Sequence, residues 1–292
     1  MLGRKLLANA QKRGHSTVAF SRQPDRNLAG ADETRLFDLS QPVDVAGLNA
    51  VIHLAGENLL GLWTKAKRKR LRESRIETTR HLVDALAAGS AADGDQKPAL
   101  ISASAVGYYG DAGEALLSEH SPPGSGFLAE LCLDWEREAN HWNDLGGRVV
   151  NARLGVVLAP DGGAFPLQRR AFSFCLGGRL GSGRQWLSWV HINDAVEMLL
   201  TATENQNKAW SGPLNVVAPG SVTNAEFTRL LAKALNRPAV LPAPAPLLRL
   251  VLRDMAQMFL NSQHAQPTAA RGHGFQFSHP GLEGALAALL RP

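Results

Sequence analysis

The stretch Met1–Arg22, MLGRKLLANAQKRGHSTVAFSR, decides the fold of the chain. An amphipathic helix beginning near Gly3 is predicted from apolar residues at helical spacing, namely Leu2, Leu6, Leu7 and Ala10. Gly14 is expected to end this helix, because the residue there must adopt a left-handed conformation. Ser16–Arg22 then alternates as a short strand. The order glycine, helix, glycine, strand and basic residue is typical of the second half of a nucleotide-binding βαβ unit.

The first strand of such a unit, and the first two glycines of its fingerprint, are absent before Met1. In a Rossmann fold that strand lies in the middle of the parallel sheet, and the backbone after it approaches the pyrophosphate. Its removal would open a slot in a buried sheet, where unpaired backbone groups are costly. We therefore expect Met1 to be an internal residue or a start assigned too late, preceded by a Val/Ile-rich strand and a Gly-x-x-Gly. The codons upstream of Met1 test this expectation.

The composition of the chain limits the classes of protein to which it can belong. With 292 residues and 45% hydrophobic content, the chain can bury one large core, or one core with a smaller appended domain. No apolar run reaches the roughly 18 residues of a membrane span, and no signal-peptide cleavage region is visible, so we expect no membrane partner. Two cysteines, Cys132 and Cys175, indicate a reducing compartment and a cytoplasmic location. No metal-binding spacing occurs among the nine histidines.

The net charge of +5 is compatible with anionic ligands but is weak evidence for nucleic acid, which we do not expect as a partner. Seven cations crowd one predicted helix: Lys65, Lys67, Arg68, Lys69, Arg70, Arg72 and Arg75. Seven cations around one helix cannot all point at one ligand, so most of them are expected to form a solvated face. Arg75 falls closer to the apolar side of the helix and could turn toward a phosphate.

Strands and helices alternate along the chain. Strands are predicted at 51–56, 99–104, 149–158, 186–192 and 214–217, and helices at 64–86, 127–145, 165–175, around 198–202, and up to Leu235. Asn193-Asp194 is expected to cap the fourth of these helices, and Thr223 or Asn224 the fifth. The predicted fold class is α/β: a Rossmann-like doubly wound parallel sheet, with its first strand missing, and a small, mostly helical C-terminal lobe. The expected domains are 1–164 with 185–217, a substrate lobe at 165–236, and a C-terminal domain at 237–292.

Three places suit a dinucleotide. Ser21-Arg22 ends the second strand of the unit with a basic residue, which suits the 2′-phosphate of NADP, where an NAD site usually has a carboxylate; alternatively, Arg22 begins a polar loop. Asp38-Leu39 could reach the adenine edge or form only a strand end and turn. Leu54-Ala55-Gly56 leaves room for the backbone to approach a cofactor, or packs strand against helix.

Several blocks of the sequence resemble the epimerase-like family of atypical extended short-chain dehydrogenases/reductases. They are VIHLAGEN at 51–58, SRIETTR at 74–80, SASAVGYYG at 102–110, GSGRQWLSWVHI at 181–192 and NVVAP at 215–219, and the tail from Arg237 resembles this family's C-terminal domain of unknown function. The resemblance implies an NADP-binding Rossmann domain with a C-terminal substrate lobe. It places cofactor contacts at Ser21, Arg22, Leu54, Ala55 and Arg75, and a backbone contact near the nicotinamide at Val157.

The catalytic pair of this superfamily is absent. Active members use Tyr-x-x-x-Lys as general acid/base and pKa-lowering partner, whereas the corresponding helix start here reads FLAELC at 127–132. By the same resemblance, Ser104 fits the helper serine that binds a substrate carbonyl. Tyr108 or Tyr109 could supply a phenol from the loop, or both could pack at the rim of the cleft. His191 is a further proton carrier to consider, although a structural hydrogen bond is the favoured interpretation.

These observations give two hypotheses. The first is an NADP-dependent oxidoreductase or epimerase acting on a carbonyl or hydroxyl group of a small or nucleotide-linked substrate. The second is a non-catalytic NADP(H)-binding sensor or scaffold, because the Tyr-x-x-x-Lys pair is gone. Extended reductases often pair through two long helices, here 64–86 and 127–145, so a homodimer is also expected by analogy.

Overall fold

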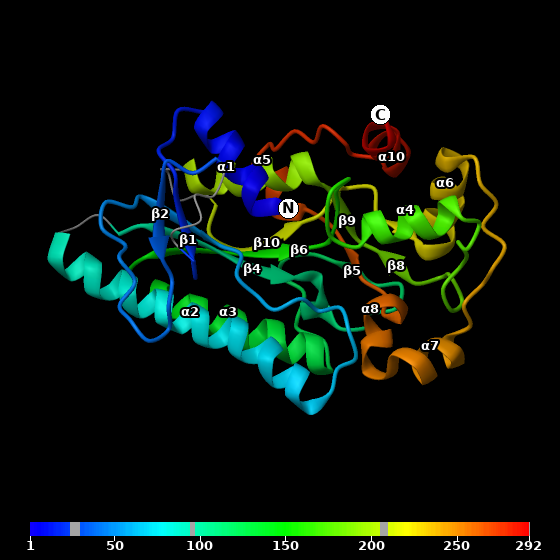
Figure 1. The fold of residues 1–292 in the computed structure, drawn as a ribbon, viewed down its shortest axis with the longest axis horizontal. Coiled ribbons are helices and arrows are strands. Elements are labelled where there is room, and N and C mark those ends of the chain that lie inside the picture. The colour runs from blue at the N-terminus through cyan, green and yellow to red at the C-terminus, as the bar shows by residue number, and fades with distance from the viewer. Residues whose placement is uncertain (24–29, 94–96, 205–209, 292) are drawn as a thin grey trace.

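The computed structural model describes residues 1–23, 30–93, 97–204 and 210–291. A parallel sheet is covered on both faces by helices (Figure 1). One face carries α1 (Leu2–Lys12) and α5 (Ile192–Glu204), whose apolar residues form one core cluster with the central strands. The other face carries α2 (Lys65–Asp93) and α3 (Phe127–Asp144), which form a second cluster. This arrangement confirms the predicted α/β, Rossmann-like class.

The sheet is divided into two pieces. The larger piece has the order β10-β6-β4-β3 with every pair parallel, and the smaller piece is the parallel pair β1-β2. Their bounds are β1 Val18–Ser21, β2 Glu33–Leu36, β3 Ala50–His53, β4 Ala99–Ala105, β6 Arg148–Leu154 and β10 Gly212–Val216. Among the described residues, β1 pairs only with β2, and β3 only with β4. The break between β1 and β3 lies where the first strand of a Rossmann sheet runs.

Two predicted strands are broken in the structure. The run predicted at 149–158 divides at Gly155, where an added Cβ would lie 2.7 Å from Ser188 O, and β7 (Val156–Leu158) leaves the main sheet to pair with β9 (Trp189–His191). The run predicted at 186–192 divides into β9 and β8 (Trp186–Leu187), which pairs antiparallel with β11 (Val222–Thr223). The close approach of Ser188 to Gly155 thus divides each predicted strand into two short strands.

The helix ends only partly match their sequence signals. The Thr223 side chain caps α6 (Asn224–Leu235) by accepting a hydrogen bond from Glu226 N, as predicted. The predicted cap at Asn193-Asp194 is wrong, because α5 already begins at Ile192. The Asp194 carboxylate instead accepts hydrogen bonds from the backbone of Ser278 and His279, and so ties the C-terminal segment to the start of α5.

The C-terminal part is mostly helical and packs into the same molecule rather than standing apart. Its elements, with the short ones that link it to the sheet domain, are the 3-10 helix η1 (Val106–Tyr109), β5 (Leu116–Leu117), α4 (Phe165–Ser173), α7 (Ala245–Leu252), the 3-10 helix η2 (Arg253–Ala256), α8 (Gln257–Leu260), β12 (His264–Ala265), α9 (Thr268–Gly272) and α10 (Leu282–Leu290). Strand β12 pairs with β5, and α4, α6 and α10 share one apolar cluster. No helix of the described part is long and apolar enough to cross a membrane.

Candidate functional site

The carboxyl ends of β1, β3 and β4 carry most of the residues singled out from the sequence. Ser21 ends β1, Leu54-Ala55-Gly56 follows β3, and Ser104 lies near the end of β4. In open parallel sheets, ligands bind outside this edge. Ala55 and Gly56 are exposed there, whereas Ser104 is buried.

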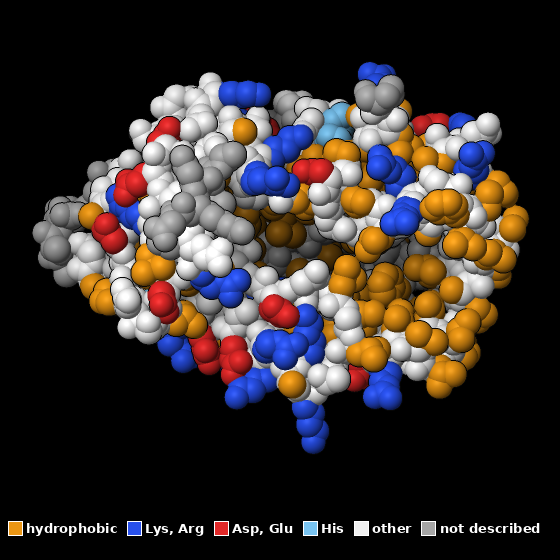
Figure 2. Space-filling view, viewed as in Figure 1, with side chains coloured by type: hydrophobic (Ala, Val, Ile, Leu, Met, Phe, Trp, Pro, Cys, Tyr) orange, Lys and Arg blue, Asp and Glu red, His pale blue; other side chains and the backbone are white. Residues whose placement is uncertain are grey.

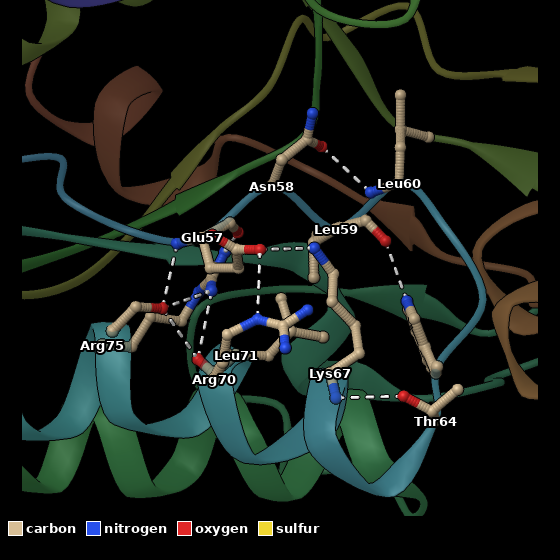
Figure 3. Close-up of polar contacts among 11 residues, drawn as sticks. Glu57, Asn58, Leu59, Leu60, Thr64, Lys67, Arg70, Leu71 and Arg75 are labelled. Carbon is tan, nitrogen blue, oxygen red and sulfur yellow. Dashed lines mark hydrogen bonds and ion pairs between the residues drawn. The ribbon is translucent and has the colours of Figure 1, made fainter.

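Arg75, on α2, lies against the loop that follows β3, beside Glu57 (Figure 3). Its side chain is buried, with 8% exposed, and donates to Leu71 O at 3.1 Å and to Glu57 O at 3.1 Å. A Cβ added to Gly56 would meet the Arg75 guanidinium carbon at 3.1 Å, so glycine leaves the room that this side chain fills. Burial lowers the pKa of Arg75. No carboxylate lies within ion-pair distance of it in the described ranges, and a buried cation of this kind is suited to an anionic ligand.

The loop after Gly56 is held to the start of α2 (Figure 3). Glu57 Oε1 lies 2.7 Å from Lys67 Nζ and 3.7 Å from Arg70 Nε, and these cations, Lys67 first, lower the pKa of Glu57. The Ser74 hydroxyl accepts from Glu57 N at 2.9 Å. Asn58 Oδ1 accepts from Leu60 N, which fixes the turn that follows. Lys67 is therefore buried and paired instead of belonging to a solvated face, because the Glu57 carboxylate reaches it.

Ser104 belongs to a buried charged network. Its hydroxyl donates to Glu136 Oε1 at 2.6 Å, and Glu136, from α3, is held by two hydrogen bonds of 2.8 Å from the fork of Arg153 on β6. Burial alone would lower the pKa of Arg153, but the hydrogen bonds and charge of Glu136 raise it above its ordinary value. Since the Ser104 proton is committed to Glu136, its oxygen is left as a hydrogen-bond acceptor.

The two loop tyrosines differ in what their hydroxyl groups contact. The Tyr109 hydroxyl accepts from Arg153 Nη1 at 3.0 Å and lies 2.7 Å from Asn215 Oδ1, and burial raises its pKa. The Arg153 guanidinium lies 3.5 Å from the centre of the Tyr108 ring. No hydrogen bond of the Tyr108 hydroxyl to another described residue is present. Arg153 is thus the cation beside these phenols, which the sequence alone does not identify.

The remaining cofactor positions lie around the same sheet edge. Arg22 is exposed directly after β1, and Ser21 Oγ accepts from Gln23 N at 3.0 Å. Asp38 and Leu39 are exposed after β2, where Asp38 Oδ1 accepts from Ser40 N at 3.0 Å in a tight turn. That turn accounts for Asp38 without a ligand, so both interpretations of this residue stay open.

Gly3 and Val157 lie on elements that meet, because a Cβ added to Gly163 would lie 3.5 Å from Val157 O and 3.6 Å from Met1 Sδ. Gly3 is in the first turn of α1, and an added Cβ would meet no atom within 4 Å. Packing against the described residues therefore does not require a glycine at this position. Val157 is in β7, paired with Val190, and its carbonyl oxygen would lie 3.5 Å from a Cβ on Gly163. The backbone at Gly3 is therefore open to close approach, whereas Val157 is paired in a ladder.

His191 makes the structural hydrogen bond favoured by the sequence. Its Nδ1 accepts from Asn193 N at 3.1 Å, and its ring lies 3.7 Å from that of His279. Burial, with smaller contributions from His279 and Lys5, lowers the pKa of His191 to about 4. The imidazole is therefore neutral near pH 7.

Sequence reasoning missed Glu136 and Arg153. Their signal is a charged residue inside an apolar pattern: Glu136 lies among the buried residues of α3, and Arg153 interrupts the apolar run of β6. Lone buried charges are too costly, so each must have a partner. The sequence marks both residues as paired, but the partner is visible only once α3 packs on β6.

The fold is that of a Rossmann-like protein, and the candidate site lies at the carboxyl edge of its sheet. The model of the NAD dependent epimerase/dehydratase family matches residues 1–217, and a domain of unknown function, DUF1731, matches residues 243–289. The chain belongs to this epimerase/dehydratase family.

Relatives extend over nearly the whole chain. Epimerase family protein Mb2239 of Mycobacterium bovis is 39% identical over 298 residues, covering 100% of this chain and 95% of its own length. Epimerase family protein YfhF of Bacillus subtilis is 35% identical, covering 99% and 94%. Among solved structures, human epimerase family protein SDR39U1 with NADPH is similar at a TM-score of 0.86 and 33% identity, covering 99% of this chain and 95% of that one.

Proposed function

We propose that this protein binds NADP(H) and acts as an oxidoreductase or epimerase on a carbonyl or hydroxyl group of a small or nucleotide-linked substrate. The observation that carries the proposal is Arg75, a buried guanidinium beside Gly56 with no carboxylate partner among the described residues. An anionic cofactor at this strand end would supply the missing charge. The similar human protein, whose structure was solved with NADPH, supports the same cofactor here.

The residues present fit such a cofactor. Arg75 and the backbone of 54–56 would hold it at the end of β3, with Ser21 and Arg22 at the 2′-phosphate and Asp38-Leu39 at the adenine edge. Gly3 would face the phosphates, and Val157 would contact the nicotinamide side. Bound NADPH would supply the hydride. Arg22 rather than an acid at the end of β1 favours NADP over NAD.

Of the chain's own groups, Ser104 would orient the ligand and Tyr108 would carry the proton. Ser104 is held by Glu136, so it orients a ligand as an acceptor, and the Tyr108 hydroxyl is the one of the two phenols with no hydrogen bond to another described residue. Tyr109, fully engaged by Arg153 and Asn215, is better suited to holding Arg153 in place.

One observation favours the alternative of a non-catalytic NADP(H)-binding sensor or scaffold. At the helix start where Tyr and Lys would stand, Phe127 packs with its ring 5.3 Å from that of Trp63, and Cys132 is buried with its pKa raised to about 12 by burial. These groups pack and do not transfer protons. A homodimer through α2 and α3 and a cytoplasmic location also stay predictions.

The cofactor assignment is tested by titrating NADPH and NADH by fluorescence. Arg22→Ala should weaken NADPH by about tenfold to a hundredfold, the worth of one charge-assisted phosphate contact, with little change for NADH. Arg137→Gln, on the exposed face of α3, is the matched control and should change neither. Equal losses for both cofactors would refute the 2′-phosphate contact. Turnover of NADPH across sugars, quinones and ketones then separates an enzyme from a sensor.

A further inference from the structure

An apolar surface covers the tip of the lobe formed by α4, α7 and the segment 238–244 (Figure 2). Of the twelve exposed large apolar side chains in the described ranges, eight belong to it, each between 51% and 77% exposed. These eight residues, here called the apolar patch, are Leu167, Phe174, Leu176, Val240, Leu241, Leu247, Leu250 and Val251. Patches of this kind mark interaction sites.

The three segments of the apolar patch are joined. Leu241 N donates to Gly177 O at 3.2 Å, and Ala243 N donates to Arg179 O at 2.9 Å, so the 238–244 segment runs beside the end of α4. Helix α7 begins two residues further on and contains no buried residue. Leu252 packs against the cluster around Met255, but Leu247, Leu250 and Val251 of α7 stay exposed in the described molecule.

The charged residues on the two segments that carry the apolar patch have one sign. Residues 165–179 and 237–253 contain no Asp or Glu, and their charged residues are Arg169, Arg170, Arg179, Arg237, Arg249 and Arg253. None of these six makes an ion pair with another described residue. The next carboxylate, Asp254, is already paired with Arg68. Whatever covers the patch must therefore be apolar and carry negative charge.

We propose that the apolar patch docks this protein on the surface of an anionic lipid bilayer. Exposed leucines and a phenylalanine would enter the boundary between headgroups and acyl chains, while the arginines contact anionic headgroups. A second copy is a poorer occupant, because it would bring arginines against arginines. The proposal concerns docking and not spanning, and it departs from the expectation of no membrane partner drawn from composition. It does not depend on the proposed cofactor.

The test is flotation of the full chain with vesicles of phosphatidylcholine alone and of phosphatidylcholine with phosphatidylglycerol. Binding is expected only with phosphatidylglycerol, and it should weaken with added salt. The double variant Leu250→Ser/Val251→Ser should weaken binding by about tenfold or more, the effect of losing at least one buried leucine. Arg170→Gln and Arg249→Gln should each weaken it by about fivefold.

Matched controls lie on α3 and at its C-terminal end, outside the patch: Arg137→Gln and Leu145→Ser should leave vesicle binding unchanged. Thermal melting of each variant verifies that the fold is retained. No flotation of the native chain, or equal flotation of patch and control variants, would overturn the proposal. So would patch variants that dissolve a dimer in gel filtration while vesicle binding persists, since the patch would then join two copies. Loss of NADPH binding would leave the vesicle result intact, so the two proposals fail separately.

Discussion

His53 illustrates how a single buried polar residue is fixed by its neighbours. Thr79 Oγ1 donates to Arg75 O at 2.6 Å and accepts from Trp135 Nε1 at 2.9 Å, so its only hydrogen is already used. His53 Nε2, 3.0 Å away, must therefore donate to Thr79. The imidazole is neutral, with its proton on Nε2. This chain of contacts also holds the backbone of Arg75 in place.

The pH dependence of stability should report this neutral histidine. Burial lowers the pKa of His53 from 6.5 to about 4, so the unfolded chain binds the extra proton first as the pH falls. The contribution of this residue to the free energy of unfolding is complete above about pH 6.5 and is lost progressively down to about pH 4. The loss amounts to about 2 kcal/mol at pH 5. Urea unfolding of His53→Gln should show a flatter pH dependence over this interval than the native chain, and the exposed His141→Gln should not. An unchanged slope for His53→Gln would contradict the assignment.

At the level of elements, the sequence predicts helices and strands well where the apolar residues follow a single helical or strand periodicity. Helix α3, predicted at 127–145, runs Phe127–Asp144, and β4, predicted at 99–104, runs Ala99–Ala105. The break at Gly155 could not be predicted, because it depends on the approach of Ser188 O from a distant segment. Arg75 and Ser104 could be singled out by pattern and resemblance. The pairing of Glu136 with Arg153 could not, because it requires α3 and β6 in their packed positions.

Breaking the ion pair between Glu136 on α3 and Arg153 on β6 should destabilise the protein, whereas replacing both partners should be tolerated. Arg153→Met leaves the Glu136 carboxylate buried beside Ser104, and should lower the free energy of unfolding by about 3–5 kcal/mol. Arg153→Met/Glu136→Gln removes both charges and should recover a large part of this loss. The control Arg80→Met removes an exposed arginine from its pair with the partly covered Glu138 and should cost about 1 kcal/mol or less. Urea titration measures all three, and a double variant no more stable than Arg153→Met would show that the pair is not the cause.

At the scale of the whole molecule, the division of the sheet and the integration of the tail matter most. Sequence reasoning treats 237–292 as a small separate domain. In the structure, Asn215 Nδ2 on β10 donates to Gln266 O at 2.9 Å, and Glu119 accepts from Ala269 N at 3.1 Å, so the tail contacts the sheet and the segment after β5 directly. The boundary at 237 rests on the resemblance of the tail to a family domain, and such long-range contacts carry no local sequence signal that could reveal them.

Unfolding should consequently be a single cooperative transition in which the tail takes part. Leu286 on α10 is fully buried in the cluster shared by α4, α6 and α10, so Leu286→Ala should cost about 2–5 kcal/mol by leaving a cavity. Because the tail packs on the sheet domain, far-UV circular dichroism and tryptophan fluorescence should shift together to lower urea with coincident midpoints. Leu145→Ala, at an exposed position outside this cluster, should shift neither. Two separated transitions, with only one moved by Leu286→Ala, would mean that the tail folds as its own unit and that the contacts of Gln266 and Ala269 do not couple it to the sheet.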